Sequence, residues 1–120
     1  MKVLLVDDEV EFVSTLAERL TLRGFDVEWV ATIADAIKKT DHKFFDVAVL
    51  DLRMPKGSGL DLKNILLKKH PDMKFIFSTG YGSEEDFKII ANQIGEEYYL
   101  VKPLDIDVLI ERIGSVLNSH

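Results

Sequence analysis

Three aspartates stand where apolar stretches of the chain end, and their positions make them candidates for chemistry. Asp7 and Asp8 directly follow Lys2–Val6, and Asp51 directly follows Val47–Leu50. Continuous apolar runs bounded by turn residues are typical of strands buried on both faces of a parallel sheet. Ligands of such sheets bind beyond the carboxyl ends of the strands. Each aspartate is therefore predicted either to cap the following turn or to act in a binding site.

The composition of this acidic set indicates which ligand it prefers. Oxygen ligands without His or Cys, too few to close a cage, favour a hard ion that retains several waters, which is Mg²⁺. Carboxylates this close raise one another's pKa unless a cation lies among them. A simpler role stays open for Asp8, because Asp8 and Glu11 also form a passable capping box at a helix start. Capping explains neither the consecutive pair nor the third acid, Asp51.

Hydroxyl and ammonium groups follow two other predicted strands. Ser78 and Thr79 stand at the end of the fourth strand, and Lys102 follows the fifth. Taken alone, each is more commonly a turn residue or a solvated cap. Together they would face the acids, with a divalent metal on one side of Asp51 and an ammonium and a hydroxyl on the other. This arrangement suits phosphoryl transfer to a carboxylate nucleophile, where catalysis is mostly positioning and charge neutralisation.

Five predicted strands alternate with five predicted helices. The strands are expected at Lys2–Val6, Phe25–Val30, Phe44–Leu50, Lys74–Ser78 and Tyr98–Val101. Apolar residues recur with helical spacing at Val13–Leu20, Ile33–Ile37, Leu62–Leu66, Phe87–Ile94 and Ile106–Val116. This alternation predicts an α/β fold, a doubly wound five-stranded parallel sheet with right-handed crossovers. Asp26 and Glu28 mark the second strand as an edge, which fits the order 2-1-3-4-5 and a switch point between strands one and three.

The overall composition limits the classes of function. A chain of 120 residues, 47% of them apolar, is expected to form a single domain over residues 1–120. The formal charge of −6 argues against non-specific nucleic-acid binding. No apolar run approaches the roughly 20 residues that span a bilayer. With no cysteine and no signal-peptide pattern, a cytoplasmic location is expected.

The chain resembles the receiver domain of two-component response regulators through one set of residues in register, Asp7-Asp8, Asp51, Thr79 and Lys102-Pro103. The resemblance covers essentially the whole chain. It implies a flavodoxin-like fold and phosphorylation of Asp51 by a histidine kinase or phosphotransfer protein. It also implies that Asp8 and Asp51 bind Mg²⁺ directly. Asp7 would act through water, and the backbone carbonyl of Arg53 would be a further ligand.

The resemblance also assigns a switch. Lys102 would pair with the phosphoryl oxygens, Thr79 would swing toward them, and Tyr99 would turn inward in response. The peptide bond between Lys102 and Pro103 would be cis. The face of the fourth helix, fifth strand and fifth helix would then bind a downstream effector domain, a protein target or a second copy of the chain.

Other positions indicate how the phosphoryl group would be tuned. Arg53, Gly80 and Tyr81 would flank it, and we expect Arg53 and Tyr81 to control how easily water reaches it. The turns around these residues look most like receivers of transcriptional activators of the nitrogen-regulation type. Such a domain is a phosphoacceptor that promotes its own phosphorylation and dephosphorylation, and is not an enzyme acting on other substrates.

Four alternatives share part of this pattern. A flavodoxin-like electron carrier needs a Ser/Thr/Gly-rich phosphate loop where Asp7 and Asp8 would repel the cofactor. An NTPase needs a GxxxxGK loop, which the sequence lacks. A phosphatase with an aspartate nucleophile after the first strand needs a second aspartate two residues later, where the chain has Glu9. A degenerate receiver, acting as a phosphate-independent protein-interaction module, is disfavoured by the complete residue set.

Overall fold

The computed structural model describes residues 1–80, 88, 92 and 98–118. Its strands are β1 (Lys2–Val6), β2 (Asp26–Val30), β3 (Val47–Asp51), β4 (Arg53–Met54), β5 (Gly57–Ser58), β6 (Lys74–Thr79) and β7 (Tyr99–Val101). Its helices are α1 (Val10–Leu22), α2 (Ile33–His42), α3 (Gly59–Lys69) and α5 (Ile106–Asn118). The helix predicted around Phe87–Ile94 lies outside the described residues.

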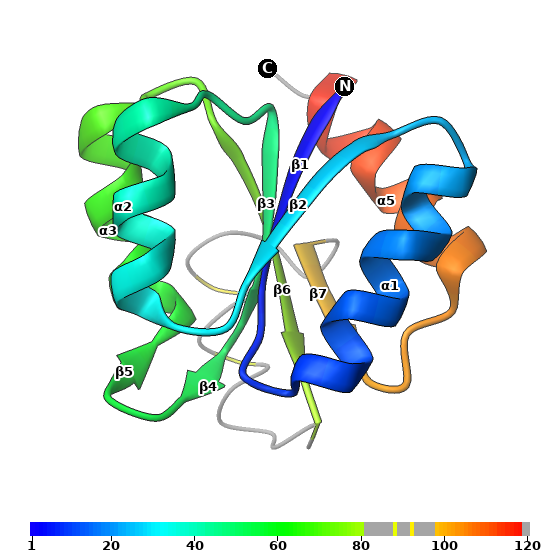
Figure 1. Ribbon diagram of the computed structural model, residues 1–120, viewed down its shortest axis with the longest axis horizontal. Helices are drawn as coiled ribbons and strands as arrows, with labels where there is room; N and C mark the ends of the chain where they lie inside the picture. The colour runs from blue at the N-terminus through cyan, green and yellow to red at the C-terminus, as the bar shows by residue number, and fades with distance from the viewer. Residues whose placement is uncertain (81–87, 89–91, 93–97, 119–120) are drawn as a thin grey trace.

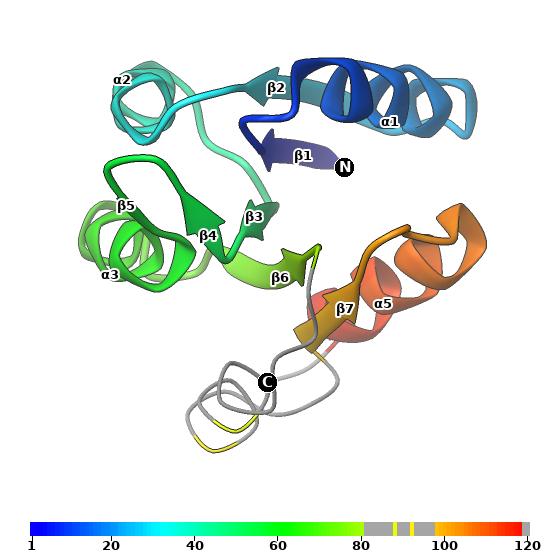
Figure 2. The same ribbon diagram turned by 90° about the horizontal axis from the view of Figure 1, so that it is seen from below.

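Five of these strands form one parallel sheet in the order β2-β1-β3-β6-β7. Helices α1 and α5 cover one face, and α2 and α3 cover the other (Figures 1 and 2). The predicted doubly wound α/β fold and its 2-1-3-4-5 strand order are therefore confirmed. Because β1 and β3 are neighbours, with Val6 beside Leu50, the residues that follow them emerge together at the switch point. In the described part of the chain, no helix has both the length and the apolar character needed to cross a membrane.

The central strands contribute to two separate cores, one on each face of the sheet. In β1, Leu4 and Val6 pack toward α2 and α3, whereas Val3 and Leu5 pack toward α1 and α5. Every residue of β3 is buried. Burial on both faces explains why these strands are continuous apolar runs and not alternating patterns. The two cores hold the strand ends that carry the aspartates.

Several boundaries differ from the prediction. β3 begins at Val47 and not at Phe44, because α2 extends to His42 and Phe44 is 46% exposed. Asp51 is the last residue of β3 and not the first residue after it. Ile65, an apolar residue within the predicted helical pattern Leu62–Leu66, is exposed. The apolar pattern therefore predicts where these elements lie, but it does not predict at which residue each one ends or which residues at the edge of a buried face are exposed.

The sequence pattern does not predict the short antiparallel hairpin of β4 and β5 that follows Asp51. Lys56 and Gly57 form its turn with φ of 69° and 156°. Glycine adopts positive φ readily, whereas a lysine does so rarely. Gly59 then begins α3 in close contact with β3, because a Cβ on Gly59 would lie 2.6 Å from the backbone oxygen of Asp51. The hairpin and this contact fix the path of the chain as it leaves Asp51.

We expect Gly59→Ala to lower the free energy of unfolding by about 1–3 kcal/mol, because the added methyl group overlaps the backbone of Asp51. Gly114 in α5 is the matched control, since a Cβ there meets nothing within 4 Å. Gly114→Ala should stabilise the protein by up to about 1 kcal/mol through helix propensity. Urea unfolding followed by circular dichroism measures both changes. A Gly59→Ala variant as stable as wild type would contradict the close contact.

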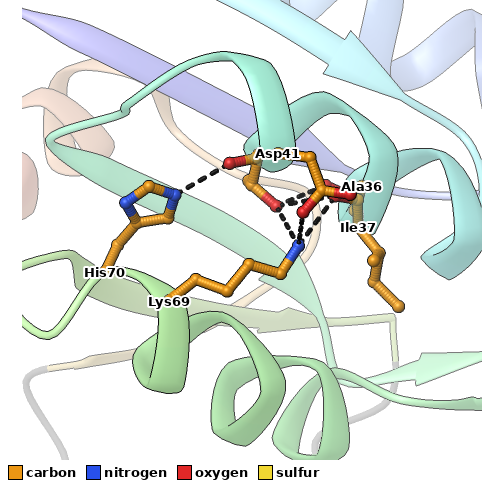
Figure 3. Close-up of polar contacts among 6 residues, drawn as sticks. Ala36, Ile37, Asp41, Lys69 and His70 are labelled. Atoms are coloured by element: carbon orange, nitrogen blue, oxygen red, sulfur yellow. Dashed lines mark hydrogen bonds and ion pairs between the residues drawn. The ribbon is translucent and has the colours of Figure 1, made fainter.

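At the opposite end of the sheet, Lys69 of α3 binds the C-terminal turn of α2 and offsets its partial negative charge (Figure 3). Its Nζ donates hydrogen bonds to the backbone oxygen of Ile37 at 3.0 Å, to Thr40 Oγ1 at 3.3 Å and to Asp41 Oδ1 at 2.5 Å. His70 Nε2 lies 2.8 Å from the backbone oxygen of Thr40. The Lys69 hydrogen bond lowers the pKa of Asp41. A cation at this position satisfies carbonyls and partial negative charge that a helix end leaves unpaired.

Lys69→Met should therefore lower the free energy of unfolding by about 1–2 kcal/mol, because α2 loses its charged hydrogen-bond donor. The neighbouring Lys68 is exposed, so Lys68→Met is the matched control and should change stability little. Chemical denaturation of both variants is the measurement. Equal losses in the two variants would show that the α2–α3 contact contributes no specific stability.

Candidate functional site

The three aspartates come together at the carboxyl ends of β1 and β3. One carboxylate oxygen from each of Asp7, Asp8 and Asp51 lies within 4.8 Å of the other two. Asp7 and Asp51 are only 4% and 5% exposed, whereas Asp8 is exposed. The predicted convergence of the three acids is confirmed. Because Asp8 faces solvent, the group is buried on one side and accessible on the other.

Backbone N–H groups orient two of these carboxylates. The N–H of Glu9 donates to Asp7 Oδ1 at 2.9 Å, and the N–H of Arg53 donates to Asp51 Oδ1 at 3.3 Å. The capping role considered for Asp8 is not observed, because Glu9 is the N-cap of α1 and makes no side-chain cap hydrogen bond. Asp7 instead accepts a hydrogen bond from the backbone of the turn that follows it. The second oxygen of each buried carboxylate faces a common cation.

That cation is Lys102, whose side chain is nearly buried. Its Nζ lies 2.7 Å from Asp7 Oδ2, 3.1 Å from Glu9 Oε1 and 3.5 Å from Asp51 Oδ2. The residue follows β7, and its backbone N–H donates to the backbone oxygen of Thr79 at 2.8 Å. The lysine was expected across the pocket from the acids, but the structure places it between Asp7 and Asp51.

The predicted switch residues lie on the strands beside Asp51. Ser78 pairs in register with Asp51, Thr79 ends β6, and both hydroxyl residues are buried. Tyr99 is already buried in the core that contains Phe77. The role of Tyr99 as a switch stays a prediction.

The structure tests the other assigned positions only in part. The peptide bond between Lys102 and Pro103 is cis, as the resemblance implies. Arg53 and Gly80 are exposed, and Tyr81 lies outside the described residues. Their roles around a phosphoryl group, and that of the Arg53 carbonyl as a metal ligand, stay predictions.

Burial is the main influence on the charge of Asp51. Desolvation and the neighbouring charge of Asp7 raise the pKa of Asp51 to about 6, although Lys102 and a backbone N–H oppose the rise. Burial also disfavours the charged form of Lys102, but its contacts with Asp7 and Asp51 outweigh burial and raise the pKa of Lys102. The lysine is therefore charged at neutral pH, whereas a fraction of Asp51 is protonated unless a further cation is present.

The residue set fits a hard divalent cation. Asp7, Asp8 and Asp51 offer only oxygen ligands, and three carboxylates exceed the single charge of Lys102. Mg²⁺ favours sites with a few carboxylates and several waters. A divalent ion held there would also favour the ionised form of Asp51 against its burial.

Known proteins are similar to this one over nearly the whole chain. Residues 3–114 match the response regulator receiver domain. The chain belongs to the response regulator receiver domain family. The luminescence regulatory protein LuxO of Vibrio campbellii is 35% identical over 115 residues, which are 96% of this receiver domain and 25% of LuxO. The receiver domain thus spans about a quarter of the length of that relative.

Solved receiver structures share the fold as well. A response regulator receiver domain protein (CheY-like) from Methanospirillum hungatei JF-1 has a TM-score of 0.86 and 31% identity, covering 98% of this chain and 93% of that one. The response regulator protein TrrA from Thermotoga maritima, solved in complex with Mg(2+)-BeF, has a TM-score of 0.78 and 28% identity, covering 96% and 97%. The predicted family and fold are therefore confirmed.

Two contacts of the receiver site were missed by the sequence reasoning. The Glu9 carboxylate pairs with Lys102, which is 93 residues away in the chain, so no local pattern joins them. The ring of Phe12 lies under the same ammonium, with its centroid 4.9 Å from Nζ. The available signal was weak: Glu9 directly follows the aspartate pair, and Phe12 comes one helical turn later.

Proposed function

We propose that this receiver domain accepts a phosphoryl group on the carboxylate of Asp51 in an Mg²⁺-dependent reaction. The observation that carries the proposal is the surroundings of Asp51. This nearly buried carboxylate has two further acids within 4.8 Å and the Lys102 ammonium at 3.5 Å. Such a group can attack phosphorus while fixed charges neutralise the phosphoryl oxygens.

The step is a phosphoryl transfer without redox change. An oxygen of Asp51 forms a bond to phosphorus, and the bond from phosphorus to the donor breaks. The leaving group keeps that electron pair, and the product is an acyl phosphate. The donor is a phosphohistidine of a kinase or phosphotransfer protein, or a small acyl phosphate in vitro. Lys102 would exchange part of its present carboxylate contacts for contacts with the new phosphoryl oxygens.

Asp7, Asp8 and Asp51 would hold Mg²⁺, with the Arg53 carbonyl as a further ligand. The ion supplies charge neutralisation at the phosphoryl oxygens. The donor set supports this assignment, because it consists of oxygens alone and one of its carboxylates is exposed to solvent. TrrA, a relative of similar fold, was solved with Mg(2+)-BeF, which is consistent with the same chemistry here.

A phosphoryl group shifts the equilibrium between two conformations only through contacts that differ between them. Signalling to a partner would therefore follow from contacts that only phosphorylated Asp51 makes. Thr79 ends β6 opposite Val101 and Lys102 directly follows β7, the strand that begins with the buried Tyr99. The face predicted for the fourth helix, β7 and α5 would then bind an effector domain, a protein target or a second receiver; that fourth helix lies outside the described residues. Within this proposal the domain works in the cytoplasm and is of the type of receiver found in nitrogen-regulation activators.

Incubation with a small acyl phosphate tests this function. Wild-type protein is expected to gain one phosphoryl group by intact-mass spectrometry when Mg²⁺ is present, and none when Mg²⁺ is chelated. A phosphatase would instead consume donor continuously without stable incorporation. A degenerate receiver would neither incorporate the phosphoryl group nor consume the donor. The behaviour of a phosphatase or of a degenerate receiver would contradict the proposal.

A further inference from the structure

The Lys102 ammonium has more carboxylate partners than phosphoryl transfer to Asp51 requires. Besides Asp7 and Asp51 it pairs with Glu9, and the Glu9 contact at 3.1 Å is shorter than the Asp51 contact at 3.5 Å. Glu9 belongs neither to the group of oxygens that could share a metal ion nor to the strand ends. Its side chain is 61% exposed, whereas those of Asp7 and Asp51 are almost fully buried. Glu9 is therefore the peripheral partner of a central cation.

The three distances show on which side of the pocket Lys102 lies. Contacts of 2.7 Å to Asp7 and 3.1 Å to Glu9 are within the ordinary range of N–H···O hydrogen bonds, and 3.5 Å to Asp51 is beyond it. The ring of Phe12 in the first turn of α1 lies 4.9 Å from the same Nζ, a distance at which a cation is attracted to a ring face. Glu9 and Phe12 therefore both hold the ammonium toward α1, away from Asp51.

We infer that Glu9 is a positioning residue that holds Lys102 on the α1 side of the site and must release it for Asp51 to be phosphorylated. The inference rests on the proposed function. A phosphoryl group on Asp51 needs the ammonium, so transfer requires Lys102 to exchange at least one carboxylate for a phosphoryl oxygen. Asp7 is fixed by its backbone hydrogen bond, so the solvent-exposed Glu9 is the partner that is given up. The Glu9 contact then slows acceptance of the phosphoryl group.

This role differs from an ordinary contribution to stability. An ion pair with one largely exposed partner contributes little to folding, so removing the Glu9 carboxylate should leave the unfolding midpoint nearly unchanged. The same contact acts directly on the one ammonium that must move during transfer. Its loss should therefore appear in the rate of phosphorylation.

The experiment measures phosphorylation of the full chain by a small acyl phosphate at saturating Mg²⁺, as a function of donor concentration. Glu9→Gln removes the charge. Glu9→Asp keeps the charge but shortens the side chain by one methylene, which we expect to move the carboxylate out of hydrogen-bond range of Lys102. Both variants are expected to raise the maximal rate of Asp51 phosphorylation about 2–5-fold, the range of one exposed ion pair. The donor concentration at half-maximal rate should stay unchanged.

Glu11→Gln is the matched control, because Glu11 is an exposed acid in the first turn of the same helix. It changes net charge equally and should keep the wild-type rate. A gain in Glu11→Gln equal to that in Glu9→Gln would overturn the inference in favour of a general charge effect. A Glu9→Asp variant with the wild-type rate would overturn it as well. Absence of any label on wild-type Asp51 would instead contradict the proposed function, so the two failures are distinguishable.

Discussion

Asp51→Asn is expected to abolish phosphoryl incorporation and, without divalent metal, to make the protein more stable at neutral pH. The first effect follows because an amide cannot act as the nucleophile. The second follows because burial and the charge of Asp7 raise the pKa of Asp51 from 3.8 to about 6. The folded protein therefore holds the ionised carboxylate at a cost, which a neutral side chain of the same shape avoids. The expected gain is about 1–3 kcal/mol at pH 7.

The gain in stability from Asp51→Asn should depend on pH. Since the folded pKa of Asp51 is above 3.8, the folded state binds this proton more tightly than the unfolded state. The contribution of Asp51 to wild-type stability should fall as pH rises from about 4 and level off above about 6. In Asp51→Asn this decline disappears, so the two proteins should differ most at pH 7 and least at pH 4.

Urea unfolding at several pH values, with Mg²⁺ chelated, measures the difference. Asp72→Asn is the control, because this substitution removes the same formal charge from an exposed turn residue. A destabilised Asp51→Asn variant at pH 7 would contradict the electrostatic description of the site. Phosphoryl incorporation in Asp51→Asn equal to wild type would contradict the assignment of the phosphoacceptor.

Lys102→Met is expected to have the largest effect on stability, a loss of about 3–5 kcal/mol at pH 7.5 without divalent metal. The ammonium lies 2.7 Å from Asp7 and 3.5 Å from Asp51, and removing one partner of a buried ion pair leaves uncompensated charge. The variant should respond by raising the pKa of Asp51 further. Protonation then relieves the repulsion, so the loss should shrink as pH falls toward 5.

Addition of Mg²⁺ should also restore part of the lost stability, because a divalent ion replaces the missing positive charge among the carboxylates. Denaturation at pH 5 and pH 7.5, with and without Mg²⁺, measures both dependences. Lys68→Met, a change at an exposed lysine in the last turn of α3, serves as the control. A Lys102→Met loss that is independent of both pH and Mg²⁺ would show that the lysine acts through packing alone.

The order of apolar and polar residues along the chain was enough to predict the strands, the helices and the order of the strands in the sheet. The apolar run Val47–Leu50 predicted a strand buried on both faces, and the alternation of strands and helices predicted the sheet order. Once β1 and β3 are neighbours, Asp7, Asp8 and Asp51 must emerge together. The convergence of the acids therefore followed from topology.

Features that depend on side-chain packing were not predictable in the same way. The position of Lys102 between Asp7 and Asp51 follows from the reach of a long side chain. The approach of Gly59 to the Asp51 backbone depends on how α3 docks on β3 after the hairpin.

The central claim is that Asp51 is the phosphoacceptor, and chemical mapping of the phosphorylated protein tests it most directly. Wild-type protein would be treated with a small acyl phosphate and Mg²⁺, reduced with borohydride and digested for peptide mass spectrometry. Borohydride converts an aspartyl phosphate to homoserine, so the account predicts homoserine at position 51, lost when Mg²⁺ is chelated or when hydroxylamine precedes reduction. Phosphoryl incorporation with homoserine at another aspartate, or with none, would contradict it.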